Sequence, residues 1–485
     1  MARKLDPSAT LTVLVAALAC GGEAGGPGPS TPRIDYVDGA IEPVLVAGAA
    51  AVIEGFGFGD SQSTGAVRFP RQAGGTVAAV VAPGTWSDRS IRIMVPDSAT
   101  SGPMTVTPAS GSTLSAAVHV LPHVSFDPLT LTWQARSAFP RAPVGVALAA
   151  GVEPAGGGAA WNATLYAAGG AEPLGGDSVI VPDSAAFVAR IVPGGGGAIG
   201  SWSRPRDLPA PRAFAVAAFA NRFNSRYNGR ALYVIGGIDS AGRSRATVFR
   251  SLATSDTALG PFVPIEPLPT PIAGAMAVVR RGRIYVMGGT DSLGRPQTSV
   301  YVGRIGLDGH IDGWYSQPSL SGPRAYGGGL VLDDRVVVFG GIQDSVRLGG
   351  GLDATPPRLA AADTARVSLT SGFLTGSWAA AGAPLPEGRS QFATLPLGDV
   401  VFVVGGLYGG AGTNAAETIA AALDGDSLGG FAGPIGANTI AGSGGGTLIG
   451  PAGVTWLDGD GSWHGIVLGG IDLVTRLRRD GAWGF

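Results

Sequence analysis

Four arginines are the strongest candidates for binding chemistry in this sequence. Each follows a proline, directly or after two intervening residues, and each comes just before an expected strand: Arg141, Arg212, Arg324 and Arg389. A guanidinium group donates two parallel hydrogen bonds to a carboxylate. If the four side chains converge, they form a site for an anionic sugar or another carboxylate.

Three aspartates in nearby loops extend this candidate site. Asp239 and Asp291 begin nearly identical segments, DSAGR at 239–243 and DSLGR at 291–295, and Asp344 lies in a longer loop. We predict that these seven residues bind ligand at one mouth of a central channel. The alternative is that each arginine braces its own repeat through backbone carbonyls. The recurrence of the arginine with the repeat favours this alternative for each residue taken singly.

Other kinds of chemistry lack the residues that they need. The single cysteine is Cys20, and the histidines, His119, His123, His310 and His464, have no close metal-ligand spacing. The 33 basic and 35 acidic residues give a net charge of −2 with no basic stripe, which argues against nucleic-acid binding. We therefore predict no catalytic residue, no metal and no cofactor.

The candidate residues stand within a repeat built on an apolar strand that ends in two glycines. The copies lie at 165–170, 232–237, 284–289, 336–341, 401–406 and 465–470. A further strand follows each pair, and a tryptophan or phenylalanine after glycine closes the unit, as at Trp202, Phe262, Trp314, Trp378, Phe431 and Trp483. This pattern resembles the kelch β-propeller family, in which one repeat forms one four-stranded blade.

The resemblance implies an all-β, six-bladed propeller over residues 129–485. Loops that enter a first strand then share a face with loops that follow a glycine pair, of which 171–184, 342–364 and 407–416 are long. Some kelch propellers are copper radical oxidases, but these need a cysteine–tyrosine cross-link and two histidines. Two segments, 129–134 and 482–485, compete to close the ring, and we prefer the C-terminal one.

Residues 32–122 predict a separate all-β domain. Seven short apolar runs, at 34–37, 51–54, 66–69, 77–82, 91–95, 104–107 and 116–120, are separated by turn residues. The glycine–aromatic turn at 55–59 and Trp86 before the run 91–95 resemble the IPT/TIG family of immunoglobulin-like domains. The resemblance implies a β-sandwich that acts as a spacer or binding module, and we interpret Trp86 as a core residue.

The N-terminus is typical of an export signal. Arg3 and Lys4 precede an apolar run at 10–19, which is too short to span a bilayer. The run ends at Cys20 and looks like a bacterial lipoprotein signal over residues 1–20, although Ala17 replaces the usual leucine. An ordinary secretory signal is the alternative. Residues 21–31 (GGEAGGPGPST) predict a flexible tether.

Together these patterns predict an exported lipoprotein that faces the periplasm or cell surface. Its only membrane contact would be the lipid on Cys20, and its propeller would present one face to a glycan or an envelope protein. Two alternatives remain open: a metal-free propeller enzyme of the epimerase or lyase type that acts on anionic sugars, and a purely structural surface protein.

Overall fold

The chain is all-β in its computed structural model. The structure describes residues 31–484 except 110, 142, 155–160, 175–178, 256, 333, 346–356, 369–370, 382–384, 409–417, 425–426, 434–447, 458–461 and 471–481. Within these residues the one helical element is the 3-10 turn η1 (Pro128–Thr130). No helix among them has the length and apolar character needed to cross a membrane. The predicted signal and Cys20 lie outside the described residues.

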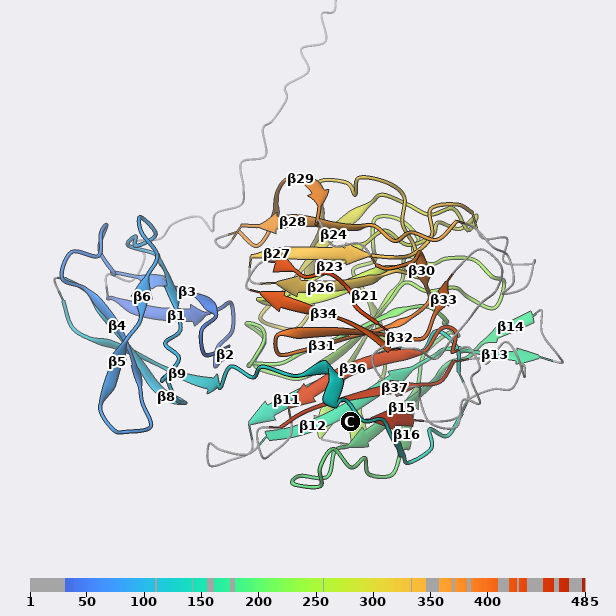
Figure 1. The fold of residues 1–485 in the computed structure, drawn as a ribbon, viewed down its shortest axis with the longest axis horizontal. Coiled ribbons are helices and arrows are strands. Elements are labelled where there is room, and N and C mark those ends of the chain that lie inside the picture. The colour runs from blue at the N-terminus through green and yellow to red at the C-terminus, as the bar shows by residue number, and fades with distance from the viewer. Residues whose placement is uncertain are drawn as a thin grey trace, which may run out of the picture.

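Two sheets make up the N-terminal unit, residues 33–121 (Figure 1). The first has the order β1 (Arg33–Val37), β3 (Ala50–Phe56), β7 (Ser90–Met94) and β6 (Val80–Val81). The second has the order β2 (Val44–Val46), β9 (Leu114–Leu121), β8 (Gly102–Thr107), β4 (Ala66–Pro70) and β5 (Thr76–Ala78).

The two sheets of the N-terminal unit share one buried core. It joins Ile53 and Ile91 of the first sheet to Phe69 and Met104 of the second. Trp86 belongs to this core, and its indole N–H donates to the carbonyl of Phe58 at 2.9 Å. The interpretation of Trp86 as a core residue is therefore confirmed.

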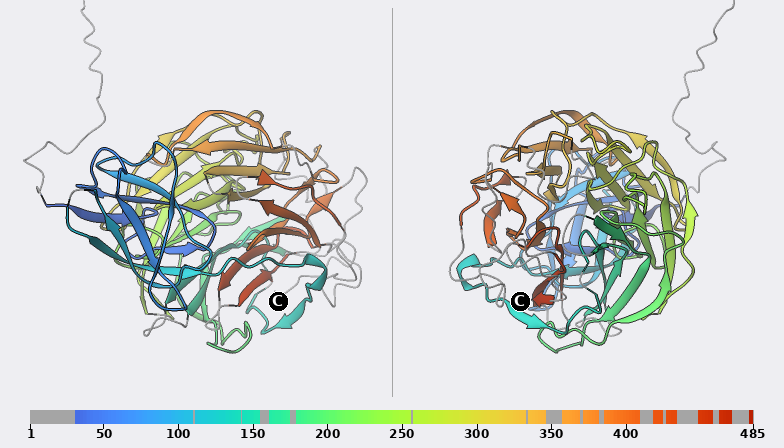
Figure 2. Two further views of the ribbon diagram at one scale, coloured as in Figure 1. Left: turned by 60° about the vertical axis from the view of Figure 1, so that its left-hand side comes forward. Right: turned by 90° about the vertical axis from the view of Figure 1, so that its right-hand side faces the viewer.

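The rest of the chain forms a ring of antiparallel sheets, seen end-on in the right-hand view of Figure 2. The first has the order β11 (Ala147–Pro154), β12 (Trp161–Ala168), β15 (Ala185–Arg190) and β16 (Ser203–Asp207). The second has the order β17 (Val216–Ala220), β18 (Ala231–Ile235) and β19 (Val248–Ser255), and both β20 (Ala258–Leu259) and β21 (Val263–Ile265) pair with β19. The third has the order β22 (Met276–Arg280), β23 (Arg283–Met287), β24 (Val300–Ile305) and β25 (Ile311–Ser316).

The remaining sheets of the ring follow the same plan. The fourth has the order β26 (Gly328–Leu332), β27 (Arg335–Phe339), β28 (Ala362–Val367) and β29 (Leu374–Ala380). The fifth has the order β31 (Ala393–Leu397), β32 (Val400–Val404), β34 (Thr418–Asp424) and β35 (Ser427–Leu428). The sixth has the order β36 (Ala452–Leu457), β37 (Trp463–Leu468), β38 (Ala482–Gly484) and β10 (Gln134–Arg136). The first strands contact one another in the cyclic order β11, β17, β22, β26, β31, β36 and back to β11.

The expected closure of the ring by its C-terminal strand is wrong. The C-terminal strand β38 is the third strand of its sheet, and the N-terminal strand β10 pairs outside it, with Ala135 opposite Trp483. The outermost position therefore comes from the start of the ring segment. This pairing ties the two ends of that segment together within one sheet.

Apolar clusters fill the space between neighbouring sheets, because no single sheet can bury both of its faces. One cluster joins Tyr166 to Leu232 and Phe262, and the next joins Tyr233 to Ile284 and Trp314. The recurring tryptophan or phenylalanine thus packs between sheets at these positions, as the repeat predicts.

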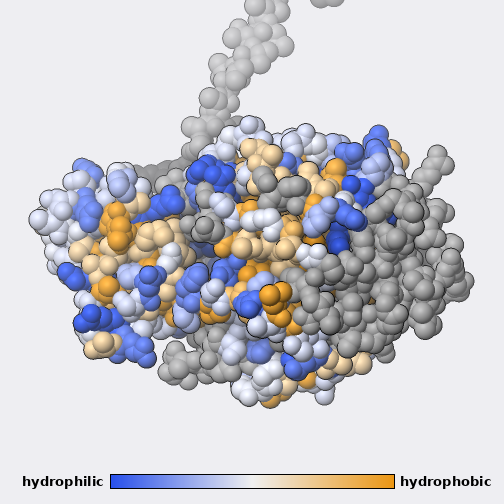
Figure 3. All heavy atoms as spheres, in the orientation of Figure 1, coloured by the Kyte–Doolittle hydropathy of each residue, from blue (hydrophilic) through white to orange (hydrophobic). Residues whose placement is uncertain are grey.

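Small two-stranded sheets project from one end of the ring: β13 (Ala171–Leu174) with β14 (Val179–Pro182), and β30 (Arg389–Ser390) with β33 (Leu407–Tyr408). This end, which carries the loops after the glycine pairs, is called the Gly-Gly face below. The N-terminal unit lies at the opposite end (Figure 1). On the side seen in Figure 3, hydrophobic and hydrophilic residues are interspersed over both parts.

Candidate functional site

The glycine pairs join each sheet to the next one around the ring. The second glycine of each pair donates its N–H to a carbonyl in the loop that enters the following sheet. The bonds are Gly170 to Arg212 (2.7 Å), Gly237 to Ile272 (2.8 Å), Gly289 to Arg324 (2.8 Å), Gly341 to Arg389 (2.7 Å), Gly406 to Leu448 (2.7 Å) and Gly470 to Pro143 (2.9 Å). The motif therefore acts between sheets.

The first glycine of each pair makes room for the same carbonyl. A Cβ atom at Gly288 would lie under 3.0 Å from the carbonyl oxygen of Arg324, and the other first glycines have the equivalent contact. Their φ angles, between 62° and 68°, lie in the left-handed region that favours glycine. Position 143 also corrects the repeat pattern: Pro143, and not Arg141, is the structural equivalent of Arg212.

A second set of backbone hydrogen bonds closes the channel at the Gly-Gly face. Six residues form a closed circle that we call the mouth ring, and each comes from the loop that enters one of the six first strands. Each member donates its backbone N–H to the carbonyl of the preceding member. The bonds are Phe214 to Gly145 (2.7 Å), Gly274 to Phe214 (2.9 Å), Tyr326 to Gly274 (2.7 Å), Gln391 to Tyr326 (2.8 Å), Gly450 to Gln391 (2.9 Å) and Gly145 to Gly450 (3.0 Å).

Side chains of the mouth ring occupy part of the space at its centre. The rings of Phe214 and Tyr326 meet edge to face, with centroids 5.3 Å apart, and they cover Gly145 and Gly274. All six members have φ between 53° and 64°, a strained conformation for phenylalanine, tyrosine and glutamine. The remaining hollow is about 130 Å³, well below the roughly 300–1,000 Å³ of small-molecule sites.

Three of the predicted arginines are buried and hydrogen-bonded inside the ring. Arg324 is 3% exposed and donates to the carbonyls of Gly340 and Ala361 and, at 2.9 Å, to Asp363. Burial lowers the pKa of Arg324, and the Asp363 carboxylate opposes this effect. The guanidinium is therefore held as part of its own sheet.

Arg389 and Arg212 are placed in a similar way. The Arg389 guanidinium donates to the carbonyl of Gly405 at 3.0 Å. Arg212 donates to the carbonyl of Pro211 at 2.7 Å, and its guanidinium lies 5.2 Å from the ring centroid of Phe249. Both side chains are buried.

Arg141 lies apart from these three residues. Its side chain is half-buried, forms an ion pair with Asp183 and lies 3.5 Å from the Glu172 carboxylate. Among the described residues, none of the seven predicted site residues lines the hollow at the mouth ring. The structure does not bring the arginines together there.

The predicted aspartates organise loop turns. One oxygen of Asp239 accepts the N–H groups of Ala241 and Arg243, at 2.9 and 3.0 Å. Its other oxygen pairs with Arg245. Partial burial raises the pKa of Asp239, but these hydrogen bonds lower it by more. The pKa of Asp239 therefore lies below its ordinary value.

Asp291 repeats this arrangement, and Asp344 does not. Asp291 accepts from Leu293 N–H and Arg295 N–H, both at 2.9 Å, and pairs with the Arg295 side chain. Burial raises the pKa of Asp291, but the same contacts bring it below its ordinary value. Asp344 is exposed in a bend.

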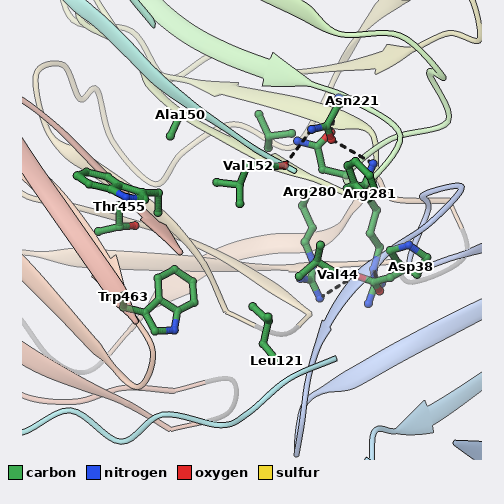
Figure 4. A pocket seen from close by; sticks show the side chains of 15 residues that line it. Asp38, Val44, Leu121, Ala150, Val152, Asn221, Arg280, Arg281, Thr455 and Trp463 are labelled. Carbon is green, nitrogen blue, oxygen red and sulfur yellow. Dashed lines mark hydrogen bonds and ion pairs between the residues drawn. The ribbon is translucent and has the colours of Figure 1, made fainter. Parts of the chain in front are cut away.

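A cavity of about 450 Å³ lies at the other end of the ring, where the N-terminal unit meets it (Figure 4). We call it the junction cavity. It is lined by Asp38, Pro43, Val44, Leu121, Ala150, Val152, Asn221, Phe223, Asn224, Val279, Arg280, Arg281, Thr455, Trp456 and Trp463. No pattern in the sequence indicated this cavity, because its walls come from segments far apart in the chain.

Three ion pairs join the N-terminal unit to the ring, and their charges are arranged in the same direction. The carboxylates belong to the N-terminal unit and the guanidinium groups belong to the ring. The pairs are Asp38 with Arg281 (2.6 Å), Glu54 with Arg226 (2.8 Å) and Glu42 with Arg222. His119 also lies here, with its ring centroid 5.6 Å from that of Phe223.

Comparison with known proteins supports the repeat type. No family model matches the chain. Beta-scruin and alpha-scruin of Limulus polyphemus are each 28% identical to it, over 188 and 112 residues. These matches cover 38% and 23% of this chain but only 19% and 12% of the scruins.

Among solved structures, one titled "Structure of YjhT" aligns with a TM-score of 0.47 and 14% identity. The alignment covers 71% of this chain and 95% of that one. The similarity to the scruins and the ring of sheets together support a kelch-type β-propeller.

Proposed function

We propose that the protein is a non-catalytic interaction protein. In this proposal the ring is a six-bladed kelch propeller that binds a protein partner through its Gly-Gly face. The N-terminal unit is an IPT/TIG-like immunoglobulin domain that acts as a spacer. The scruin similarity and the repeated interblade contacts support the propeller part of the proposal.

The closed mouth ring is the observation that carries this proposal. Its backbone circle, with Phe214 and Tyr326 across it, leaves a hollow too small for a typical small-molecule ligand. At the channel mouth a partner therefore meets loop surfaces, which suits recognition of a protein. A separate hollow of about 600 Å³ lies on the same face beside Leu293 and Arg243. Leu293, 70% exposed in the turn that Asp291 organises, offers an apolar contact there.

The arginine contacts also favour a structural role over sugar chemistry. An enzyme for anionic sugars needs guanidinium groups that can turn to a carboxylate. The donors of Arg324 and Arg389 are directed to backbone carbonyls of their own blades. Recruiting them for a ligand would leave buried carbonyl groups unpaired, at a cost of about 1–3 kcal/mol each.

The location is part of the proposal and rests on the sequence. A short basic segment, the apolar run at 10–19 and the only cysteine, Cys20, support an exported lipoprotein. Labelling cells with a palmitate analogue tests this directly. The wild-type chain should incorporate the label and Cys20→Ala should not; equal labelling of both would refute lipidation at Cys20.

Two exposed leucines at opposite ends of the ring give a matched test of the binding face. Leu293 lies on the Gly-Gly face. Leu307, 69% exposed, lies in the turn between β24 and β25 at the other end. We expect an envelope protein to co-purify with the wild type. This co-purification should be lost in Leu293→Arg and unchanged in Leu307→Arg. Loss with only Leu307→Arg, or with neither, contradicts the proposed face.

A further inference from the structure

The junction cavity has an apolar wall with two tryptophans from the last sheet of the ring. Trp456 and Trp463 line it together with Leu121 and Val152 (Figure 4). Trp456 is 1% exposed, and its indole N–H has no hydrogen-bond partner among the described residues. A buried donor of this kind is normally satisfied. The cavity therefore has an apolar wall beside a buried donor.

The opposite wall carries excess positive charge. Arg280 and Arg281 both line the cavity, and Asp38 is the one carboxylate among its described lining residues. Asp38 lies 2.6 Å from Arg281 but 3.6 Å from Arg280. The Nε of Arg280 and one terminal nitrogen of Arg281 are buried and have no hydrogen-bond partner within the part of the chain that the structure describes. One carboxylate thus stands against two guanidinium groups whose donors are not all used.

Two hairpin turns meet at the same contact. Asp38–Gly39 and Arg281–Gly282 are two-residue turns closed by the pairs Val37–Ala40 and Arg280–Arg283, and their φ angles of 49°, 71°, 49° and 68° are those that such turns require. The packing of one turn against the other holds Asp38 beside Arg281.

We propose that the junction cavity binds a small carboxylic acid with an apolar body. The carboxylate would lie on Arg280 and Arg281, where guanidinium groups can donate paired hydrogen bonds. The apolar body would lie against Trp463, Leu121 and Val152. The volume of about 450 Å³ is in the range of small-molecule sites. This site is distinct from the proposed protein-binding face, and neither proposal depends on the other.

Calorimetric titration of the full mature chain with decanoate, below its micelle concentration, tests this site. We expect saturable one-site binding and at least about tenfold weaker binding of decanol, which lacks the charge. Arg280→Met should weaken decanoate binding about tenfold, and Leu121→Trp should abolish it by filling the cavity. Arg243→Met, at the exposed Gly-Gly face, is the control and should bind as the wild type does.

Three results would overturn the proposal: no saturable binding of decanoate up to millimolar concentration, equal affinity for decanol, or wild-type affinity in Arg280→Met. Thermal melting of each variant separates loss of the site from loss of the fold. Because Arg280 is only partly buried, its substitution decides the question even if Leu121→Trp does not fold.

Discussion

The peptide N–H of Gly289 donates a 2.8 Å hydrogen bond to the carbonyl of Arg324, which lies in the next sheet of the ring. The neighbouring Gly288 has no room for a Cβ atom because this carbonyl stands over it. The side chain of Arg324, in turn, is fixed by Gly340, Ala361 and Asp363. One arginine therefore connects two sheets through its backbone and secures its own sheet through its side chain.

Gly288→Ala should destabilise the ring by roughly 2 kcal/mol or more, because it combines a steric clash with a left-handed φ. Gly322→Ala is the matched control: a Cβ atom there meets nothing within 4 Å. It should change stability by less than about 0.5 kcal/mol. Urea unfolding of the two variants measures the difference, and equal midpoints would contradict the proposed contact.

Arg324→Met should cost about 3–5 kcal/mol, because it leaves the nearly buried Asp363 carboxylate without its counter-charge, with Ser321 still donating to it, and removes a donor from the Gly340 and Ala361 carbonyls. Arg141→Met removes a pair whose side chains are 32% and 20% exposed and should cost less than about 1 kcal/mol. The same unfolding measurement compares them. A stable Arg324→Met protein that has lost only ligand binding would favour a ligand-binding role for this arginine.

The recurring glycines were recognisable in the sequence because each pair makes the same contact in all six sheets. Among the arginines only Arg324 and Arg389 share a contact, to the carbonyl of a first glycine. The shared face of the two loop types was also predictable, and bridges such as Ala213 with Ile238 confirm it. The mouth ring was not predictable from residue type. Its six positions hold three glycines, Phe214, Tyr326 and Gln391, and only their common backbone conformation unites them.

The closing strand and the junction cavity depend on contacts between distant segments. The sequence offered two candidate segments, 129–134 and 482–485, for one position. The structure places β38 third in the sheet and β10 outermost, and β10 overlaps the first candidate only at Gln134. The cavity joins Asp38 near the N-terminus to Trp463 near the C-terminus. Local patterns carry no information about such a pairing, and the arginines at 280 and 281 stand outside the repeated motif.

Asp38→Asn should loosen the N-terminal unit, because it leaves the nearly buried Arg281 guanidinium without a counter-charge. Asparagine tolerates the left-handed φ of this position, so the change removes charge with little added strain. Small-angle X-ray scattering should show a larger radius of gyration. Glu42→Gln, at a more exposed pair, should scatter as the wild type does; identical curves for all three proteins would contradict the role of Asp38.

The turns at Asp239 and Asp291 should make stability depend on acid pH. The pKa of each carboxyl is lower in the folded state than its ordinary value of 3.8. Each ionised carboxylate therefore stabilises the fold fully at a pH above 3.8. This stability is lost as the pH falls through the lowered pKa. A double variant, Asp239→Asn with Asp291→Asn, should be less stable than the wild type at pH 7, and the gap should shrink below about pH 4. A gap that stays constant from pH 7 to pH 3 would contradict the assignment.

Photo-crosslinking in intact cells tests the proposed binding face most directly. A benzophenone side chain is placed at position 293 on the Gly-Gly face or at position 307 at the opposite end, two leucines of nearly equal exposure, 70% and 69%. The proposed function predicts a protein-sized adduct from position 293 and none from position 307. An adduct from position 307 alone, or no adduct from position 293, would contradict it.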